Sequence, residues 1–343
     1  MKIGIVGLAM AGKKTLFQIL SENGKNLVKR GNVELALTTV FDNRLKKLAD
    51  MYNPKKTTYA HLEFILTPSI TKENKGSTKA LNAIHSVDGI VIVVKDYKMT
   101  ADDKPTPQED FEFVYNEIIF NDLFNVESRL EKIEKMIRKI NDPLQKKHKI
   151  ILEKAKAHLE ANKALRDMEM NEEETTIIKS FDFLSMKPYL VLVNIDESAI
   201  GQERDYKFLG NGFETLSLKI EEEMNLLEAE EQQEFLDSLG LKESGLNKLI
   251  ADSYNITNLI SFFTAGEDEV KAWTIRKNTN ARKAAGEIHS DIEKGFIRAE
   301  VISYDDFIKA GSEKEAKNQK LYRLEGKDYL VQDGDIINFR FNV

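Results

Sequence analysis

The N-terminal residues have the types and spacing of a phosphate-binding loop. Residues 2–6 are typical of a short buried strand, a loop runs from Gly7 to Gly12-Lys13, and residues 15–20 are typical of a helix. In G-x-x-x-x-G-K-[S/T] loops, backbone N–H groups surround phosphates at the helix N-terminus and the lysine reaches the β- and γ-phosphates. The sequence therefore predicts a nucleoside triphosphate site at Gly7, Ala11, Gly12 and Lys13.

One residue of this loop changes its expected chemistry. Lys14 stands where the pattern has Ser or Thr, whose hydroxyl binds Mg²⁺. A protonated amine cannot coordinate a cation, so Lys14 either neutralises phosphate charge in place of the metal or points to solvent. Thr15 is the remaining candidate metal ligand. The loop can hold a nucleotide, but it lacks one usual means of hydrolysing it.

The composition limits the classes of protein that fit this chain. With 343 residues it is long enough for two or three domains, and 41% hydrophobic and 31% charged residues are typical of a globular protein. No apolar run reaches the roughly 18 residues of a membrane helix. The absence of cysteine excludes disulfides and thiolate metal sites, and the five histidines show no metal-binding spacing. We therefore expect a cytoplasmic protein without a membrane segment.

The apolar patterns divide the chain into regions. Runs at 62–66, 89–94 and 188–193 predict buried strands. Together with the strand before the phosphate loop they indicate a doubly wound α/β domain. Nucleotide sites in such domains lie at the carboxyl ends of the strands, where Gly7 and Asn194 fall.

A helical region interrupts this domain from about 111 to 178. Apolar residues recur every three or four positions from Leu123 to Ile140 and again from Ile151 to Leu159, with a break at 141–143, which predicts an antiparallel helical hairpin. Net charge is −7, which argues against nucleic-acid binding over the whole surface. Residues 132–156, however, carry nine Lys or Arg against three acids, and this basic arm could meet a phosphate backbone.

The last region, from about 262 to 343, predicts a small α+β domain. Strands are expected at 270–275 and 296–301, and a helix at 281–292. Residues 328–331 and 336–339 predict two strands joined by a tight turn at 333–335.

The chain resembles the YchF family, the ATP-preferring branch of the Obg-related P-loop proteins. The resemblance extends over nearly the whole chain and is strongest in the last region. Its matching runs are FFTAG (262–266), VKAWTIRK (270–277), AGEIH (285–289), GFIRAEVI (295–302), LEGKDY (324–329) and QDGD (332–335). It implies a P-loop core in two parts (1–110 and 179–261), an inserted helical arm (111–178) and a C-terminal TGS domain (262–343) of ubiquitin-like β-grasp fold. It also implies work near the ribosome.

The resemblance also indicates how the site departs from its family. The family loop reads G-L-P-N-V-G-K-S-T; Ala9, Met10, Ala11 and Lys14 differ from it. Where the family has E-F-V-D-I-A-G, Leu66 replaces the acid that holds Mg²⁺ through water, and Ser69 replaces the glycine that contacts the γ-phosphate. The loop before Asp42 is shortened, and Thr38 and Thr39 are switch candidates by proximity only.

The base-reading segments are better preserved. Asn194-Ile195-Asp196-Glu197 stands where GTP-specific relatives have N-K-x-D, and the longer Glu197 no longer fits guanine, so the resemblance implies ATP in preference to GTP. Ser217-Leu218-Lys219 matches the family's S-A-K loop beside the base. The predicted site residues are therefore Gly7, Ala11, Gly12, Lys13, Lys14, Thr15, Asn194, Ile195, Glu197, Ser217 and Leu218.

Three functional hypotheses follow. The first is an ATP-binding, ribosome- or RNA-associated regulator that acts through its arm and TGS domain, with weak or lost hydrolysis and little need for Mg²⁺. The second is an active ATPase with rearranged metal ligands, for example Thr15. The third is an interaction protein that binds no nucleotide.

Overall fold

The computed structural model of the protein describes residues 1–22, 24–30, 33–71, 77–140, 142–210, 212–241 and 243–342. The chain forms two compact units, which are described separately. The first unit contains Met1–Thr38 and Glu63–Leu249, and the second contains Thr39–Leu62 and Ile250–Val343.

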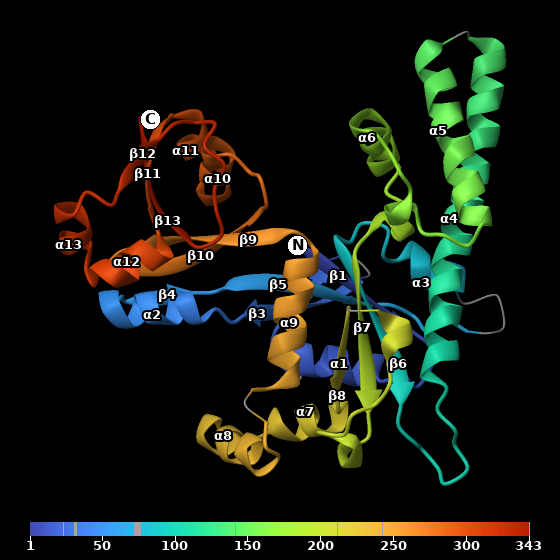
Figure 1. The fold of residues 1–343 in the computed structure, drawn as a ribbon, viewed down its shortest axis with the longest axis horizontal. Helices are drawn as coiled ribbons and strands as arrows, with labels where there is room; N and C mark the ends of the chain where they lie inside the picture. The colour runs from blue at the N-terminus through green and yellow to red at the C-terminus, as the bar shows by residue number, and fades with distance from the viewer. Residues whose placement is uncertain are drawn as a thin grey trace. The chain divides into compact units, whose positions relative to one another are not determined.

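A seven-stranded sheet in the order β2-β3-β5-β1-β6-β7-β8 organises the first unit (Figure 1). Strands β5, β1, β6, β7 and β8 pair in parallel. The chain places β5 on one side of β1 and β6 on the other, which is the reversal of strand order that marks a doubly wound sheet. The strands are β1 (Lys2–Gly7), β2 (Leu27–Arg30), β3 (Val33–Val40), β5 (Ala60–Leu66), β6 (Gly89–Asp96), β7 (Tyr189–Ile195) and β8 (Phe213–Leu216).

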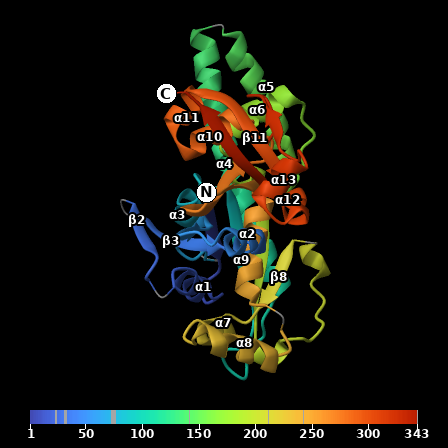
Figure 2. The same cartoon turned by 90° about the vertical axis from the view of Figure 1, so that its left-hand side faces the viewer.

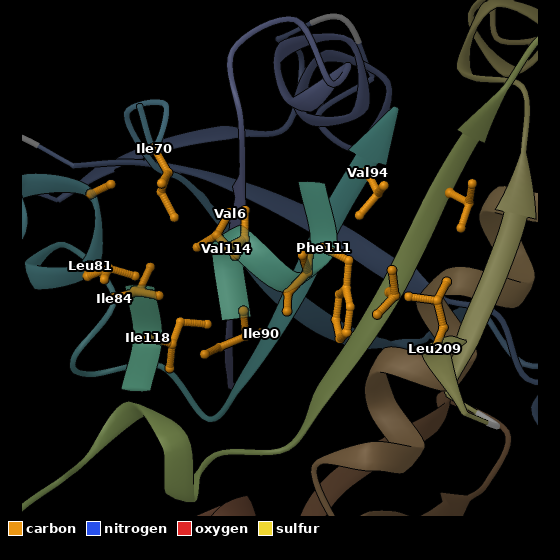
Figure 3. Close-up of a cluster of buried hydrophobic side chains, with 14 of the residues drawn as sticks. Val6, Ile70, Leu81, Ile84, Ile90, Val94, Phe111, Val114, Ile118 and Leu209 are labelled. Atoms are coloured by element: carbon orange, nitrogen blue, oxygen red, sulfur yellow. The ribbon is translucent and has the colours of Figure 1, made fainter. Parts of the chain in front are cut away.

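The predicted α/β P-loop class is confirmed, because the continuous apolar runs become buried strands. In β6, every residue from Gly89 to Val94 is buried, as expected for a strand covered on both faces. Val6, Ile90 and Val94 lie in one cluster with Phe111 and Ile118 of the arm helix (Figure 3). This core holds the carboxyl ends of β1 and β6 in place.

Helices of the first unit connect the strands and form the insertion. They are α1 (Lys13–Leu20), α3 (Ser77–Asn82), α4 (Pro107–Lys139), α5 (Pro143–Glu160), α6 (Glu172–Ser180), α7 (Leu218–Met224) and α8 (Ala229–Ser238), with short 3-10 turns η1 (Leu165–Asp167), η2 (Leu184–Met186), η3 (Glu197–Ala199) and η4 (Lys207–Leu209). Helix α9 (Gly245–Ile256) begins in the first unit, and its residues from Ile250 on belong to the second. Within the described residues, no helix combines the length and apolar character needed to span a bilayer.

Helices α4 and α5 form the predicted antiparallel hairpin, called the arm below (Figure 1). Asp142 caps α5 by accepting a hydrogen bond from the Leu144 N–H at 2.9 Å, and Pro143 occupies the first helical turn. A proline there loses no helical hydrogen bond. Val126 and Ile133 of α4 are buried in one cluster with Leu152 of α5, so the two apolar stripes face each other.

A hairpin of β2 and β3 forms the outer edge of the first sheet (Figure 2). It stands where the sequence analysis expected a shortened switch loop. Thr38 lies in β3, is buried, and donates its hydroxyl to the Leu20 carbonyl at 2.9 Å. That hydroxyl is therefore engaged in the fold rather than free for a ligand.

The second unit is built on a six-stranded sheet in the order β12-β11-β13-β9-β10-β4. Its strands are β4 (Lys56–Thr58), β9 (Leu259–Ala265), β10 (Glu269–Arg276), β11 (Phe296–Ser303), β12 (Arg323–Glu325) and β13 (Asp335–Phe341). Its helices are α2 (Asn43–Tyr52), α10 (Ala281–Ile288), α11 (Ser290–Lys294), α12 (Tyr304–Ala310) and α13 (Glu313–Asn318).

Two expectations for this region were wrong. Residues 328–331 do not form a strand with 336–339; only an isolated bridge joins Leu330 to Asn280, because β13 pairs with β11 and β9 instead. The helix expected over 281–292 is two helices, because His289 is extended (φ −161°, ψ 143°) and caps α11 by accepting from the Asp291 N–H.

Residues 39–62 join the C-terminal strands, which the sequence did not indicate. Strand β4 pairs in parallel with β10, and Tyr52 at the end of α2 stacks on Phe307 with ring centroids 5.7 Å apart. The second unit is therefore assembled from two distant stretches of chain.

Candidate nucleotide site

The predicted phosphate loop connects β1 to α1, as the strand–loop–helix pattern requires. Gly7 and Gly12 both have positive φ angles, 152° and 105°. A Cβ at Gly7 would lie 2.4 Å from the Val93 carbonyl oxygen, and a Cβ at Gly12 would lie 2.5 Å from the Asn194 amide nitrogen. Only glycine fits either position. The loop is thus shaped by its backbone, with the N-terminus of α1 directly after it.

Lys13 is buried in this loop and faces its carbonyl groups. Its Nζ donates to the carbonyl oxygens of Gly7 at 2.9 Å and Leu8 at 2.6 Å, and to the Ser69 hydroxyl at 3.1 Å. Burial, with a smaller contribution from neighbouring Lys14, lowers the pKa of Lys13 to about 8. A desolvated ammonium group gains more from an incoming phosphate than a hydrated one does, so the arrangement suits an anionic ligand.

The other departures from the pattern lie in the first turn of α1 and at or just after the end of β5. Lys14 is exposed, and Thr15 is partly buried on the first turn of α1. Leu66 ends β5, and Ser69 replaces a glycine within reach of the Lys13 amine. The structure therefore brings Lys13 and Ser69 together, while Leu66 offers no polar atom there.

Asn194 joins the phosphate loop to the segment expected beside the base. Its amide donates to the Ala11 carbonyl and accepts from the Leu218 N–H, both at 3.1 Å. A residue 6% exposed with both amide atoms occupied acts as a positioning residue. Asn194, Ala11, Gly12 and Leu218 therefore form one connected group.

The remaining base-side residues differ in their availability. Ile195 is buried in the core. Glu197 is exposed and pairs with Lys219 at 2.8 Å. Ser217 is 3% exposed, and its hydroxyl has no hydrogen-bond partner among the described residues. A buried hydroxyl without a partner is unusual, and it lies next to Leu218, which contacts the phosphate loop.

Comparison with known proteins identifies the relatives of this chain. A Bacillus subtilis protein named ribosome-binding ATPase YchF is 38% identical over 366 residues, covering 99% of each chain. A Mycoplasma genitalium protein of the same name is 37% identical over 369 residues with the same coverage. The chain belongs to the YchF family. The family model YchF-GTPase_C, described as "Protein of unknown function (DUF933)", matches residues 259–342.

A solved YchF structure agrees with this membership. The structure of the Schizosaccharomyces pombe YchF GTPase matches with a TM-score of 0.89 at 29% identity, covering 99% of this chain and 97% of that one. The YchF resemblance seen in the sequence is confirmed, together with the β-grasp character of the C-terminal region.

The residues present do not fit the magnesium site that P-loop chemistry uses. Lys14 presents an ammonium group and Leu66 a hydrocarbon where oxygen ligands are needed. Within the described part of the chain, no three His, Asp or Glu side chains are grouped so as to hold a metal ion. We therefore derive no step of the chemistry through a metal.

Sequence reasoning missed one residue outside the phosphate loop that bonds to it. Tyr97, directly after β6, donates its hydroxyl to the Met10 carbonyl at 2.7 Å. Met10 has a positive φ of 62°, so this bond holds a strained turn of the loop. A lone tyrosine after a strand carries no motif, and only the fold brings it to the loop.

Proposed function

We propose that this YchF-family protein binds adenine nucleotides at the phosphate loop and hydrolyses them weakly or not at all. It would act as a cytoplasmic regulator at the ribosome, in line with its relatives, which are named ribosome-binding ATPase YchF. The observation that carries the proposal is the buried Lys13 amine inside a loop that keeps both glycines, next to Ser69, with Leu66 at the position of the family's acid. Phosphate binding needs the glycine loop and the Lys13 amine. Efficient phosphoryl transfer also needs the acidic residue and the glycine that Leu66 and Ser69 replace.

One feature supports the preference for adenine over guanine, and two more concern the binding of either base. The Asn194 amide already bonds to Ala11 and Leu218, which fixes its position and leaves one N–H for a base. Glu197 pairs with Lys219 instead of presenting a short carboxylate in the place of the N-K-x-D aspartate. The Ser217 hydroxyl is buried and unpaired within the described residues, and a base could satisfy it.

A titration with a fluorescent ATP analogue, with and without Mg²⁺, tests the proposal. We expect binding that changes less than about threefold on removal of Mg²⁺, with GTP weaker and turnover near the buffer rate. Strong Mg²⁺ dependence with turnover would favour the active ATPase, in which Thr15 provides a ligand. Absence of binding would favour the third hypothesis, an interaction protein that binds no nucleotide.

Restoring the family residues sharpens this test. The double variant Lys14→Ser/Leu66→Asp should make binding sensitive to Mg²⁺, because it returns a hydroxyl and a carboxylate. Lys14→Ala alone is the matched control, since it removes the exposed ammonium without adding a ligand. If Lys14 contacts phosphate, this control weakens binding by roughly tenfold, the worth of one charged hydrogen bond.

The arm supports the proposed ribosome contact only through part of its basic cluster. Lys149 and Lys156 pair with Glu134 and Glu127 of α4 at 2.9 and 2.8 Å, and Lys154 pairs with Glu174 at 3.2 Å. Paired charges of this kind mainly stabilise the hairpin. The exposed bases without an ion pair among the described residues are Lys132, Lys135, Arg138, Lys139 and Lys146.

Ribosome co-sedimentation tests the arm. Charge reversal at Lys135, Arg138 and Lys146 should release the protein into the supernatant at moderate salt, because phosphate contacts are electrostatic. Reversal at Lys25, Lys98 and Lys104, which are exposed and lie outside the insertion, changes the net charge equally and should leave sedimentation unchanged. Equal behaviour of the two variants would leave the TGS domain as the proposed contact.

A further inference from the structure

A cleft of about 710 Å³ is lined only by residues of the second unit, none of which belongs to the phosphate loop. This volume is within the range of small-molecule sites. Four stretches of chain line it: 40–44, 251–261, 277–278 and 331–333. No predicted site residue falls among them.

Four asparagines contribute side-chain amides to the lining. Asn43, Asn255, Asn258 and Asn278 all face the cleft, and none of their amide groups bonds to another described residue. Each offers one acceptor and two donors. Asn258 and Asn278 have φ angles of 55° and 67°, so backbone geometry also favours asparagine there.

An aromatic ring stands at the same cleft. Phe41 is 63% exposed, yet its ring is braced edge-on by Tyr59 with centroids 5.6 Å apart. An exposed phenylalanine held in place is a stacking platform rather than a core residue.

The charges of the wall are nearly balanced. Arg44 bonds to Asp42 and Asp333, each at 2.8 Å, and lies over the Phe263 ring. This leaves Lys277 as the lining cation without an ion pair among the described residues. The cleft thus combines amides, one ring face and one free positive charge.

We infer that this cleft binds an unpaired nucleobase, stacked on Phe41 and hydrogen-bonded by the asparagine amides, with Lys277 facing the attached phosphate. Aromatic stacking and amide contacts to base edges are the means by which proteins hold single-stranded RNA. A neutral sugar would use the ring and the amides but leave Lys277 without a role. The base can come from an RNA strand or from a free nucleotide, and the experiment below separates these sources.

Photo-crosslinking on the wild-type protein gives a site-resolved test. A fluorescein-labelled single-stranded octaribonucleotide containing 5-iodouridine is irradiated with the full chain, and the adduct is located by mass spectrometry. We expect the adduct on the peptide that contains Phe41, including in the variant with reversed charges on the arm. Adducts confined to other parts of the chain would overturn the inference.

Binding of the same oligonucleotide, measured by anisotropy, tests the individual groups. Phe41→Leu should weaken binding about tenfold, the effect of losing one stacked base. Asn258→Gly/Asn278→Gly removes two amides while keeping the left-handed backbone, and should weaken it severalfold. Phe124→Leu, at an exposed ring of α4, and Asn53→Gly, at another left-handed asparagine, are the matched controls.

Competition identifies the source of the base. Displacement by AMP or UMP indicates that the cleft accepts free nucleotides, and displacement only by unlabelled single strands indicates RNA. A duplex of the same length should not compete, because its bases are already stacked. The proposal would be refuted if both cleft variants bound the single strand as tightly as the wild type does, or if the duplex competed as well as the single strand.

Discussion

The phosphate loop and the amide-lined cleft are built in opposite ways. The loop is one short stretch whose shape comes from its glycines, and loops of this pattern bind phosphate mainly through backbone N–H groups. The cleft is assembled from four separate stretches, and the groups proposed to bind its ligand are side chains. One added methyl group at a glycine should abolish binding at the loop. Removing one side chain at a time from the cleft should instead weaken binding by a limited factor each time. The variants below test this contrast.

Gly12→Ala should have the largest effect. The added methyl would lie 2.5 Å from the Asn194 amide and 2.7 Å from Leu218 at a φ of 105°. We expect undetectable nucleotide binding and a loss of about 2–4 kcal/mol of stability, measured by titration and chemical unfolding. Gly201→Ala is the control, because Gly201 also has a positive φ, 74°, but its Cβ would have nothing within 4 Å. Equal losses in both variants would show that backbone strain alone matters.

Lys13→Met should weaken ATP binding by roughly 10- to 100-fold, the worth of one charge-assisted hydrogen bond to phosphate. Burial of the apolar stem is kept, so the thermal midpoint should change little. Oligonucleotide binding at the cleft should be unchanged. If ATP affinity is retained, the ammonium group that contacts Gly7 and Leu8 does not serve the ligand.

Arg44→Met should affect only the second unit. Burial alone would lower the pKa of the Arg44 guanidinium, but its hydrogen bonds to Asp42 and Asp333 raise it overall. Losing these bonds should cost about 2 kcal/mol, seen as faster hydrogen exchange in β9 and β13 and weaker oligonucleotide binding. Arg340→Met, which removes an exposed pair with Glu300, should cost less than about 1 kcal/mol. A loss of nucleotide affinity in Arg44→Met would contradict the separation of the two sites.

Nucleotide affinity should fall by about two- to tenfold between pH 7 and pH 9. The pKa of Lys13 is about 8 in the free loop, and a bound phosphate raises it, so binding above pH 8 takes up a proton. Calorimetry in buffers of different ionisation enthalpy measures this uptake. Stability has the opposite sign: the unfolded chain keeps the proton up to about its ordinary pKa of 10.5, so the penalty for burying charged Lys13 disappears as pH rises from 8 to 10.5. The Lys13→Met variant should show neither effect.

Tyr97→Phe should have the smallest effect. It removes the hydroxyl that bonds to the Met10 carbonyl and keeps the ring beside Lys95. We expect about threefold weaker nucleotide binding, in line with one neutral hydrogen bond. Tyr59→Phe, in the second unit, should leave nucleotide affinity unchanged.

The sequence predicted those parts of the fold whose residues are local. The strands at 62–66, 89–94 and 188–193, the arm hairpin and the loop at Gly7–Lys13 all follow from periodicity or spacing within one segment. The wrong strand at 328–331 has a different cause. Its residues are typical of a strand, but β13 pairs with β11 and β9 instead. Which strands pair is decided by the whole sheet and not by one apolar segment.

For the nucleotide site as well, the sequence predicted the residues that belong to local motifs. Lys13, Gly12 and Asn194 could be named from their motifs, and they lie together; their role in binding stays a prediction. Ser217 gave no sign that its hydroxyl would be buried without a partner. Tyr97 and the cleft residues could not be predicted, because their roles depend on contacts outside their own segments. Tyr97 bonds to Met10, and Phe41 packs against Tyr59.

The pairing of β4 with β10 affects how this protein can be divided for experiments. A fragment cut at the limits of the family model, 259–342, would lack β4 and α2. It would expose the edge of β10 along Glu269–Lys271, the face of Phe307 that Tyr52 covers, and an Asp333 deprived of Arg44. An uncovered strand edge invites self-association. An autonomous fragment would instead need residues 39–62 grafted through a linker to 250–343, or a split pair of chains expressed together.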